Sequence, residues 1–333
     1  MTSSQEIPIL VTGGAGYIGS HTTKALLDHG YDVTVVDDLS RGYRHNVAAD
    51  RLEVMNLSDT GGLTRILTEK SVAAVIHFAA YIAVGESTVK PELYFQNNVG
   101  GSLSLLTAMV RADVRNLVFS STAAVYGMPA ASPITEDFPL NPINPYGESK
   151  LMVEKMLRWF DGAHDLRSIS LRYFNASGAD PAGVLGEEHE PETHLIPLIL
   201  RAVKTGRPVT IFGVDYPTPD GSCIRDYIHV MDLAEAHVVA LETLLGGGRS
   251  DRFNAGTGTG HSVLEVIRAV EQVTGKKAPY TVGARREGDP PALVADSTRL
   301  QKTLGWKPRY TDLLDIVATA WTFEKNHAGV KIT

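Results

Sequence analysis

At 333 residues, with 43% hydrophobic and 21% charged residues, the chain has an ordinary globular composition and enough length for a large domain and a smaller one. Its net charge of −7 disfavours a broad nucleic-acid surface, while the single cysteine, Cys223, excludes an internal disulfide and fits a reducing compartment. We find neither a signal peptide nor an apolar run of membrane-spanning length, and therefore expect a cytoplasmic protein that binds neither nucleic acid nor membrane.

The first half of the chain alternates short β-branched runs with longer amphipathic stretches. This alternation predicts βαβ units and hence an α/β fold of the Rossmann type, a doubly wound parallel sheet with helices on both faces. The predicted strands are Ile7–Thr12, Tyr31–Val36, Ala74–Phe78 and Asn116–Ser121, and the predicted helices are Ile18–Asp28, Thr60–Lys70 and Glu92–Ala112.

After about Ala176 the rhythm changes, because Pro and Gly become denser and the loops lengthen. A smaller, mixed α/β domain is therefore expected in the second half. We place the first domain over residues 1–175 and the second over residues 176–333.

A glycine-rich turn follows the first predicted strand and opens the first predicted helix. Gly13, Gly16 and Gly19 permit a tight turn, a close backbone approach to a pyrophosphate and close helix–strand packing. The helix N-terminus favours the phosphate charge. Asp37, which follows the next strand, can accept hydrogen bonds from the adenosine ribose and repel a 2′-phosphate, which favours NAD over NADP. Asp38, one position further on, competes for this role.

Tyr146 and Lys150 are four residues apart at the start of a predicted helix that Pro145 opens, so both project from one face. A neighbouring ammonium lowers the pKa of a phenol, because it stabilises the phenolate. Such a tyrosine can take a proton from an alcohol while a hydride leaves the same carbon. Thr122, at the end of the fourth strand, is placed to bridge the substrate oxygen and Tyr146.

Combined motifs over nearly the whole chain resemble a known family. The glycine turn, the Ser-Ser-Thr-Ala-Ala-Val-Tyr-Gly run (120–127) and the Tyr146/Lys150 pair resemble the extended short-chain dehydrogenases. Arg-Tyr-Phe-Asn (172–175), Ile-Arg-Asp-Tyr-Ile-His-Val (224–230) and Arg-Arg-Glu-Gly-Asp (285–289) are similar specifically to the UDP-glucose 4-epimerase family.

The resemblance implies a redox-neutral reaction on a UDP-sugar. Tyr146 deprotonates the 4-hydroxyl while NAD takes the C4 hydride, and the keto sugar turns to receive the hydride on its other face. It also implies that residues 224–245 return to the first domain, and that the chain forms a homodimer through Glu92–Ala112 and Pro145–Phe160.

The expected sites are assembled from the motifs and the resemblance together. The catalytic residues are Thr122, Tyr146 and Lys150. The cofactor-binding residues are Gly13, Gly16, Tyr17, Ile18, Gly19, Asp37, Asp38, Asn56, Leu57, Phe78, Ala79, Asn98, Ser120, Tyr146, Lys150, Tyr173 and Phe174. The substrate-binding residues are Thr122, Asn175, His194, Leu195, Phe212, Arg225, Arg286, Asp289 and Leu293.

Several positions depart from the family pattern. Ile82 replaces a lysine, Asn56 an aspartate near the adenine, and His194 an asparagine near the substrate. Leu293 stands where a bulky tyrosine excludes N-acetylated sugars, so some activity on UDP-N-acetylhexosamines is hypothesised.

The sequence also bears on several alternative functions. A 4,6-dehydratase or a related decarboxylase needs proton-transferring groups after Thr122, where this chain has Ala123 and Ala124. A UDP-glucuronate 4-epimerase and a non-catalytic NAD-sensing protein stay open as alternatives. No metal is expected, because His-Glu-Pro-Glu-Thr (189–193) lacks the second histidine of a zinc-binding helix and contains a proline.

Overall fold

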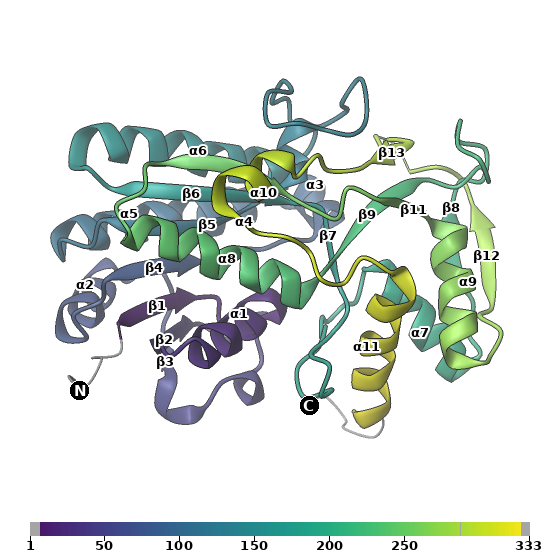
Figure 1. Ribbon diagram of the computed structural model, residues 1–333, viewed down its shortest axis with the longest axis horizontal. Helices are drawn as coiled ribbons and strands as arrows, with labels where there is room; N and C mark the ends of the chain where they lie inside the picture. Colours follow the sequence, from purple (N-terminus) through teal and green to yellow (C-terminus); the bar gives the residue numbers. More distant parts are fainter. Residues whose placement is uncertain (1–6, 287, 328–333) are drawn as a thin grey trace.

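The computed structural model describes residues 7–286 and 288–327, so Glu287 of the arginine-rich motif lies outside the described residues. Its largest unit is a seven-stranded parallel sheet with the order β10-β6-β5-β4-β1-β2-β3 (Figure 1). The predicted Rossmann-type sheet is confirmed. Its strands are β1 (Pro8–Thr12), β2 (Asp32–Asp37), β3 (Leu52–Val54), β4 (Ala74–His77), β5 (Asn116–Thr122), β6 (Arg167–Tyr173) and β10 (Asp251–Ala255).

Helices cover both faces of this sheet because its central strands are apolar on both sides. Along β1, Ile9 and Val11 belong to one hydrophobic cluster and Leu10 to another, as the two-residue period of a strand requires. The first face is covered by α1 (Tyr17–Asp28) and α8 (Val230–Leu245), and the second by α2 (Thr60–Glu69), α5 (Gly101–Arg111) and α6 (Pro145–His164).

The helix predicted over Glu92–Ala112 is not a uniform α-helix. It begins as α4 (Pro91–Tyr94), widens into a π-helical segment over Phe95–Gly100 and continues as α5. Such π-helical segments are rare and often occur at functional sites. Here the segment holds Asn98, whose side-chain amide donates a hydrogen bond to Ser149 Oγ on α6 over 3.0 Å.

Of the expected return over residues 224–245, the part from Val230 packs against the first sheet as helix α8. The segment Ile224–His229 forms β9 of a second sheet, and only α8, from Val230 onward, packs against α1. Strand β10 then pairs with β6, with Phe253 opposite Leu171. The return therefore runs through Ala255, because β10 is needed to cover the open edge of β6.

The second domain holds the remaining sheets. A four-stranded sheet joins β9 to β7 (Asn175–Ser177), β11 (Gly260–Ser262) and β13 (Ala292–Leu293), and β8 (Val209–Phe212) pairs with β12 (Tyr280–Gly283). Its core lies among three helices, α7 (Leu195–Thr205), α9 (Val263–Thr274) and α11 (Leu313–Asn326). The short helices α3 (Val84–Val89) and α10 (Thr298–Leu304) complete the fold.

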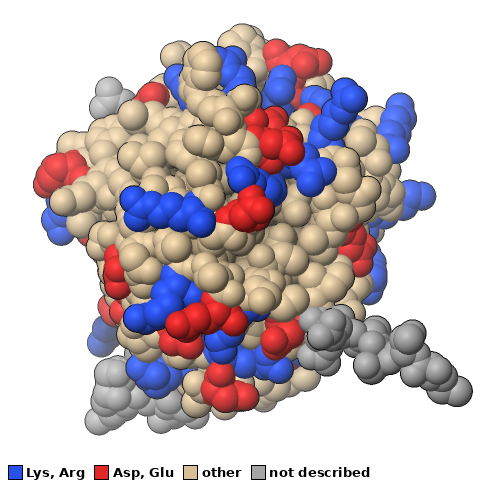
Figure 2. Space-filling view, turned by 90° about the vertical axis from the view of Figure 1, so that its left-hand side faces the viewer, with Lys and Arg blue, Asp and Glu red and all other residues tan. Residues whose placement is uncertain are grey.

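Two observations concern the surface. Among residues 7–286 and 288–327, no helix has both the length and the apolar composition that crossing a membrane requires. On the face shown in Figure 2, basic and acidic side chains are interspersed with neutral ones, and neither sign covers it alone. That face therefore lacks the clustered cations of a nucleic-acid surface.

Candidate functional site

A cleft of about 2290 Å³ runs from the glycine turn of the first domain to the second domain. It lies at the carboxyl ends of the parallel strands, where open α/β sheets bind ligands. The structure brings together there every expected site residue except Asn98. From the second domain the cleft receives Asn175, His194, Leu195, Phe212, Arg225, Arg286, Asp289 and Leu293.

The glycine turn between β1 and α1 is built for a close backbone approach. Gly13 has a φ of +73°, and a Cβ there would lie 2.5 Å from the backbone nitrogen of Ala79. A Cβ on Gly19 would lie 2.2 Å from the Gly13 oxygen, so this glycine permits the helix to sit against the turn. Gly16, the N-cap of α1, has no side chain to bond the free amides of the first helical turn. The residues present therefore fit a pyrophosphate.

The two aspartates after β2 have different surroundings. Asp37 is buried, and its carboxylate accepts hydrogen bonds from the Ala15 amide over 3.0 Å and the Leu39 amide over 2.8 Å. It is thus fixed beside the glycine turn. Asp38 accepts a hydrogen bond from the Asn56 side-chain amide over 2.7 Å. It also accepts one from the Ser40 amide over 2.9 Å, so both carboxylates are held through two bonds and differ in that Asp37 is buried and Asp38 is half-buried.

Asn98 supports the wall of the cleft instead of lining it. The residue is 2% exposed, its amide donates to the Tyr81 carbonyl oxygen over 3.0 Å, and its side-chain oxygen accepts from the Tyr81 amide over 2.8 Å. Together with the bond to Ser149, these contacts fix the loop after β4 to α6. Asn98 is therefore a positioning residue for that loop.

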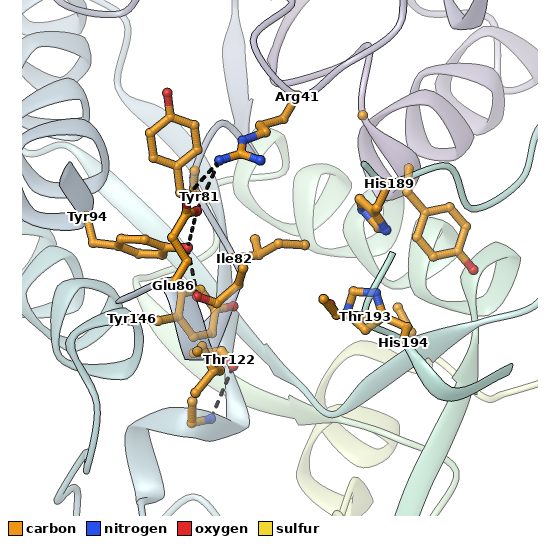
Figure 3. A pocket seen from close by; sticks show the side chains of 18 of the residues that line it. Arg41, Tyr81, Ile82, Glu86, Tyr94, Thr122, Tyr146, His189, Thr193 and His194 are labelled. Carbon is orange, nitrogen blue, oxygen red and sulfur yellow. Dashed lines mark hydrogen bonds and ion pairs between the residues drawn. The ribbon is translucent and has the colours of Figure 1, made fainter. Parts of the chain in front are cut away.

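The tyrosine and lysine lie on one side of the first turns of α6. The Asn144 side chain caps this helix by accepting a hydrogen bond from the Gly147 amide over 2.8 Å. Tyr146 is 8% exposed and faces Thr122, at the end of β5, across the floor of the cleft (Figure 3). The Lys150 ammonium donates to the Ser120 carbonyl oxygen over 2.8 Å.

The pKa of Tyr146 shifts in the direction opposite to the one that the sequence interpretation gives. Burial raises the pKa of the Tyr146 phenol, and its hydrogen bond with Thr122 only partly opposes that rise. Burial also lowers the pKa of the Lys150 ammonium to about 7. Burial therefore disfavours the charged forms of both groups, the phenolate and the ammonium. A reactive phenolate needs further positive charge in the cleft.

At the far end of the cleft, two arginines from separate segments meet. Arg225 on β9 forms an ion pair with Asp289 and donates to the Pro290 carbonyl oxygen over 2.9 Å. The Arg286 guanidinium lies over the Phe212 ring, 4.1 Å from its centroid. These planar cations suit a diphosphate with an adjoining ring system.

Arg41, in the loop after β2, also lines the cleft, and sequence reasoning missed it. Its guanidinium forms an ion pair with Glu86 over 3.0 Å and lies over the Tyr81 ring, 5.2 Å from the centroid (Figure 3). This cation lies beside the loop that carries Ile82, where the family pattern has a lysine. A lone arginine four residues past Asp37 has no sequence signal of its own.

On the loop before α7, Glu187, His189, Glu192 and His194 converge (Figure 3 labels the histidines), and of these four the sequence predicted only His194 as a site residue. Burial opposes protonation of His194, but Glu187 and Glu192 raise the pKa of its imidazole to about 10. For His189 the same balance gives a pKa of about 9.

A phosphate-binding turn, a fixed aspartate and a buried Tyr–Lys pair in one cleft define a dinucleotide-dependent enzyme of the short-chain dehydrogenase type. Comparison with known proteins agrees. Residues 9–256 match the model of the NAD dependent epimerase/dehydratase family. The UDP-glucose 4-epimerase of Lactobacillus helveticus is 50% identical over 321 residues, which cover 96% of this chain and 97% of that protein.

Two solved structures extend the likeness to the fold. A UDP-glucose 4-epimerase from Brucella ovis in complex with NAD has a TM-score of 0.93 and 47% identity, covering 95% of this chain and 97% of that one. The UDP-Glc/GlcNAc 4-epimerase of Campylobacter jejuni has a TM-score of 0.83 and 40% identity, covering 96% and 99%. The chain belongs to the NAD-dependent epimerase/dehydratase family and, within it, to the UDP-glucose 4-epimerases.

Proposed function

We propose that this chain interconverts UDP-glucose and UDP-galactose with Tyr146 as the acid and base. The observation that carries this proposal is the placement of Tyr146, which is buried and faces Thr122 on the floor of the cleft that also holds the glycine turn. A proton acceptor at this position serves an alcohol whose carbon faces a dinucleotide.

NAD fits the first-domain end of the cleft. The glycine turn would hold its pyrophosphate, Asp37 its adenosine ribose and Lys150 its nicotinamide ribose. Bound NAD supplies reversible hydride transfer at sugar C4 and a positive charge beside Tyr146. That charge favours the phenolate, which the buried chain alone disfavours.

Other residues of the chain move the proton and bind the UDP part of the substrate. The Tyr146 phenolate takes the proton of the 4-hydroxyl and returns it to the same oxygen, while Thr122 orients that oxygen through its hydroxyl. At the other end, Arg225 and Arg286 bind the diphosphate and Phe212 packs against the uridine. Holding the UDP part alone leaves the sugar free to present either face to the nicotinamide.

The first test is turnover without added cofactor. Purified protein incubated with UDP-galactose is expected to form UDP-glucose in the absence of added NAD, because the hydride returns within the site. Product is followed by chromatography, with UDP-galacturonate and UDP-N-acetylgalactosamine as parallel substrates. Turnover of the uronic substrate alone would identify a UDP-glucuronate 4-epimerase instead. A lack of turnover by protein that binds NAD would identify a sensor.

A second substrate class is favoured by Leu293 on β13. This half-buried side chain lines the cleft and packs against the cluster that contains Val125 and Tyr126. Leucine leaves more room than tyrosine, which supports acceptance of the N-acetyl group. The name of the Campylobacter jejuni relative, UDP-Glc/GlcNAc 4-epimerase, includes both sugar types.

Leu293→Tyr is expected to lower kcat/KM for UDP-N-acetylglucosamine by about 10–100-fold, because the larger ring fills the space for the acetamido group. Activity on UDP-galactose should change little. Leu293→Met, which conserves volume, is the control and should keep both activities. The idea fails if the unmodified chain converts UDP-galactose rapidly and does not convert UDP-N-acetylglucosamine at all.

Exposed apolar side chains on two neighbouring helices of the first domain indicate how two copies of the chain associate. We propose a homodimer paired through α5 and α6, because Leu103 on α5 and Met152 and Trp159 on α6 are 46%, 38% and 69% exposed. Met152 and Trp159 are seven residues apart and share one helix face.

The buried, unpaired Cys223 fits a reducing compartment, and we propose the cytoplasm. We assign NAD to the first domain and the UDP-sugar to the second.

A further inference from the structure

Four metal-ligating side chains meet on the loop that leads from β7 into α7. Glu187, His189, Glu192 and His194 each offer one ligand atom, and these four atoms all lie within 4.8 Å of one another. His194 Nδ1 lies 2.7 Å from Glu187 Oε1 and 3.3 Å from Glu192 Oε1. His189 Nδ1 lies 3.4 Å from Glu187 Oε1 and 3.7 Å from Glu192 Oε2.

The same side chains carry buried polar atoms without hydrogen-bond partners. Within the described residues, Glu187 Oε1, His189 Nδ1, Glu192 Oε2 and His194 Nδ1 are all buried and accept or donate no hydrogen bond. They are close enough for ion pairing, but their mutual geometry forms no hydrogen bond. Unsatisfied buried polar atoms are rare in folded proteins, and four that converge on one point indicate a missing partner.

The surrounding contacts orient one of these ligands. Glu192 Oε1 accepts hydrogen bonds from the amides of Thr193, over 2.7 Å, and His194, over 2.9 Å. These bonds fix the Glu192 carboxylate and leave Oε2, which lies 3.7 Å from His189 Nδ1, free for a ligand. Outer contacts that fix a ligating carboxylate in this way are typical of metal sites.

We propose that Glu187, His189, Glu192 and His194 bind one divalent transition-metal ion, and that Zn²⁺ is the best match. Two imidazole nitrogens and two carboxylate oxygens form a four-coordinate set that zinc accepts. Ligand atoms about 2.0–2.1 Å from a tetrahedral centre lie about 3.3 Å apart. Three separations between these atoms, 2.7, 3.4 and 3.7 Å, bracket this value, and all of the atoms lie within 4.8 Å of one another.

The position of the site gives the ion a structural role. His189 packs edge-on against Tyr17 of the glycine turn, with ring centroids 6.3 Å apart. On the same loop, Glu188 pairs with His45 over 2.8 Å, which ties it to the first domain. His194 directly precedes Leu195, the first residue of α7 and a residue of the substrate end of the cleft. With all four positions filled by the protein, the ion would fix the loop between the two binding regions.

The sequence pattern did not indicate this site because its ligands do not follow a helical period. A zinc-binding helix places two histidines four residues apart, whereas His189 and His194 are five apart with Pro191 between them. The loop turns back on itself and brings Glu187 to the histidines. Only the folded loop shows the four atoms together.

The test uses the full-length chain, free of any histidine tag and dialysed against Zn²⁺ or Co²⁺. We expect one metal ion per chain by elemental analysis, and visible absorption bands of tetrahedral Co²⁺. His189→Gln/His194→Gln should weaken Co²⁺ binding by more than about 100-fold, since changes to outer contacts alone cost 10–100-fold. His261→Gln, on β11 outside the cleft, is the matched control and should bind as the unmodified chain does.

If the double variant does not fold, the thermal stability of the unmodified chain provides a second measurement. In the unmodified chain, Zn²⁺ should raise Tm and a chelator should reverse the rise, because the ion binds only the folded loop. Glu192→Gln should abolish this shift. The proposal is overturned if the unmodified chain binds no ion and its Tm is indifferent to Zn²⁺; the carboxylates then pair with protonated histidines only. UDP-galactose turnover is measured separately, so failure of the metal site leaves the proposed reaction standing.

Discussion

Tyr146→Phe is expected to lower kcat for UDP-galactose conversion by about 10²–10⁴-fold, the range that general acid–base catalysis contributes. The phenyl ring fills the same buried space, where the side chain is 8% exposed, so the fold should persist. Only the hydroxyl that faces Thr122 is lost. NAD content and UDP affinity, measured by absorbance and calorimetry, should stay near those of the unmodified chain.

Tyr280→Phe is the matched control for this change. Tyr280 lies on β12, is 45% exposed and does not line the cleft, so loss of its hydroxyl should leave kcat unchanged. A Tyr146→Phe enzyme with full turnover and full NAD content would show that another group moves the proton. A loss of turnover that follows loss of NAD would reassign Tyr146 to cofactor binding.

The strand–helix alternation made the first domain predictable, because fully buried parallel strands are short apolar runs between turn signals. The predicted strand Asn116–Ser121 differs from β5 by one residue. Three strands of the sheet were missed for different reasons. Strand β3 is only three residues long and partly exposed. Strand β6 carries Arg167 and Arg172 and so lacks a continuous apolar run, while β10 follows a long stretch of second-domain sequence. Local patterns do not show which distant segment completes a sheet edge.

The cofactor end of the site was predictable because it follows local rules. Glycine spacing and the aspartate after the second strand are read directly from the chain, and both line the cleft. The pKa of Tyr146 was not predictable in this way, because spacing shows that Lys150 is near and does not show that both groups are desolvated. The residues of the second domain depended on the resemblance, since five separate segments contribute them.

The proposed metal-binding loop could not be predicted from the sequence for a different reason. The run His189–Thr193 was considered and dismissed, because it lacks the second histidine of a zinc-binding helix and contains a proline. Ligand sets on irregular loops have no fixed period, so the physical signal is the convergence of unpartnered atoms in three dimensions. Composition alone indicates only that suitable ligands exist.

The second large effect is expected on stability. Arg172→Met should lower the free energy of unfolding by about 3–5 kcal/mol, the cost of removing one partner of a buried ion pair. Arg172 on β6 is 1% exposed, and its guanidinium donates to both oxygens of Glu154 on α6, over 2.9 and 2.5 Å. It also donates to the Tyr126 hydroxyl over 3.0 Å. The change leaves the Glu154 carboxylate, which is 9% exposed, without its cation.

Urea unfolding followed by circular dichroism measures this effect. Arg51→Met, which breaks a partly exposed pair with Asp32 over 2.9 Å, is the control and should cost only about 0–1 kcal/mol. In Arg172→Met/Glu154→Leu both charges are gone, so most of the lost stability should return. A double variant as unstable as Arg172→Met would mean that packing of the arginine stem, and not the uncompensated carboxylate, sets the cost. An Arg172→Met chain as stable as the control would show that water reaches Glu154 between β6 and α6.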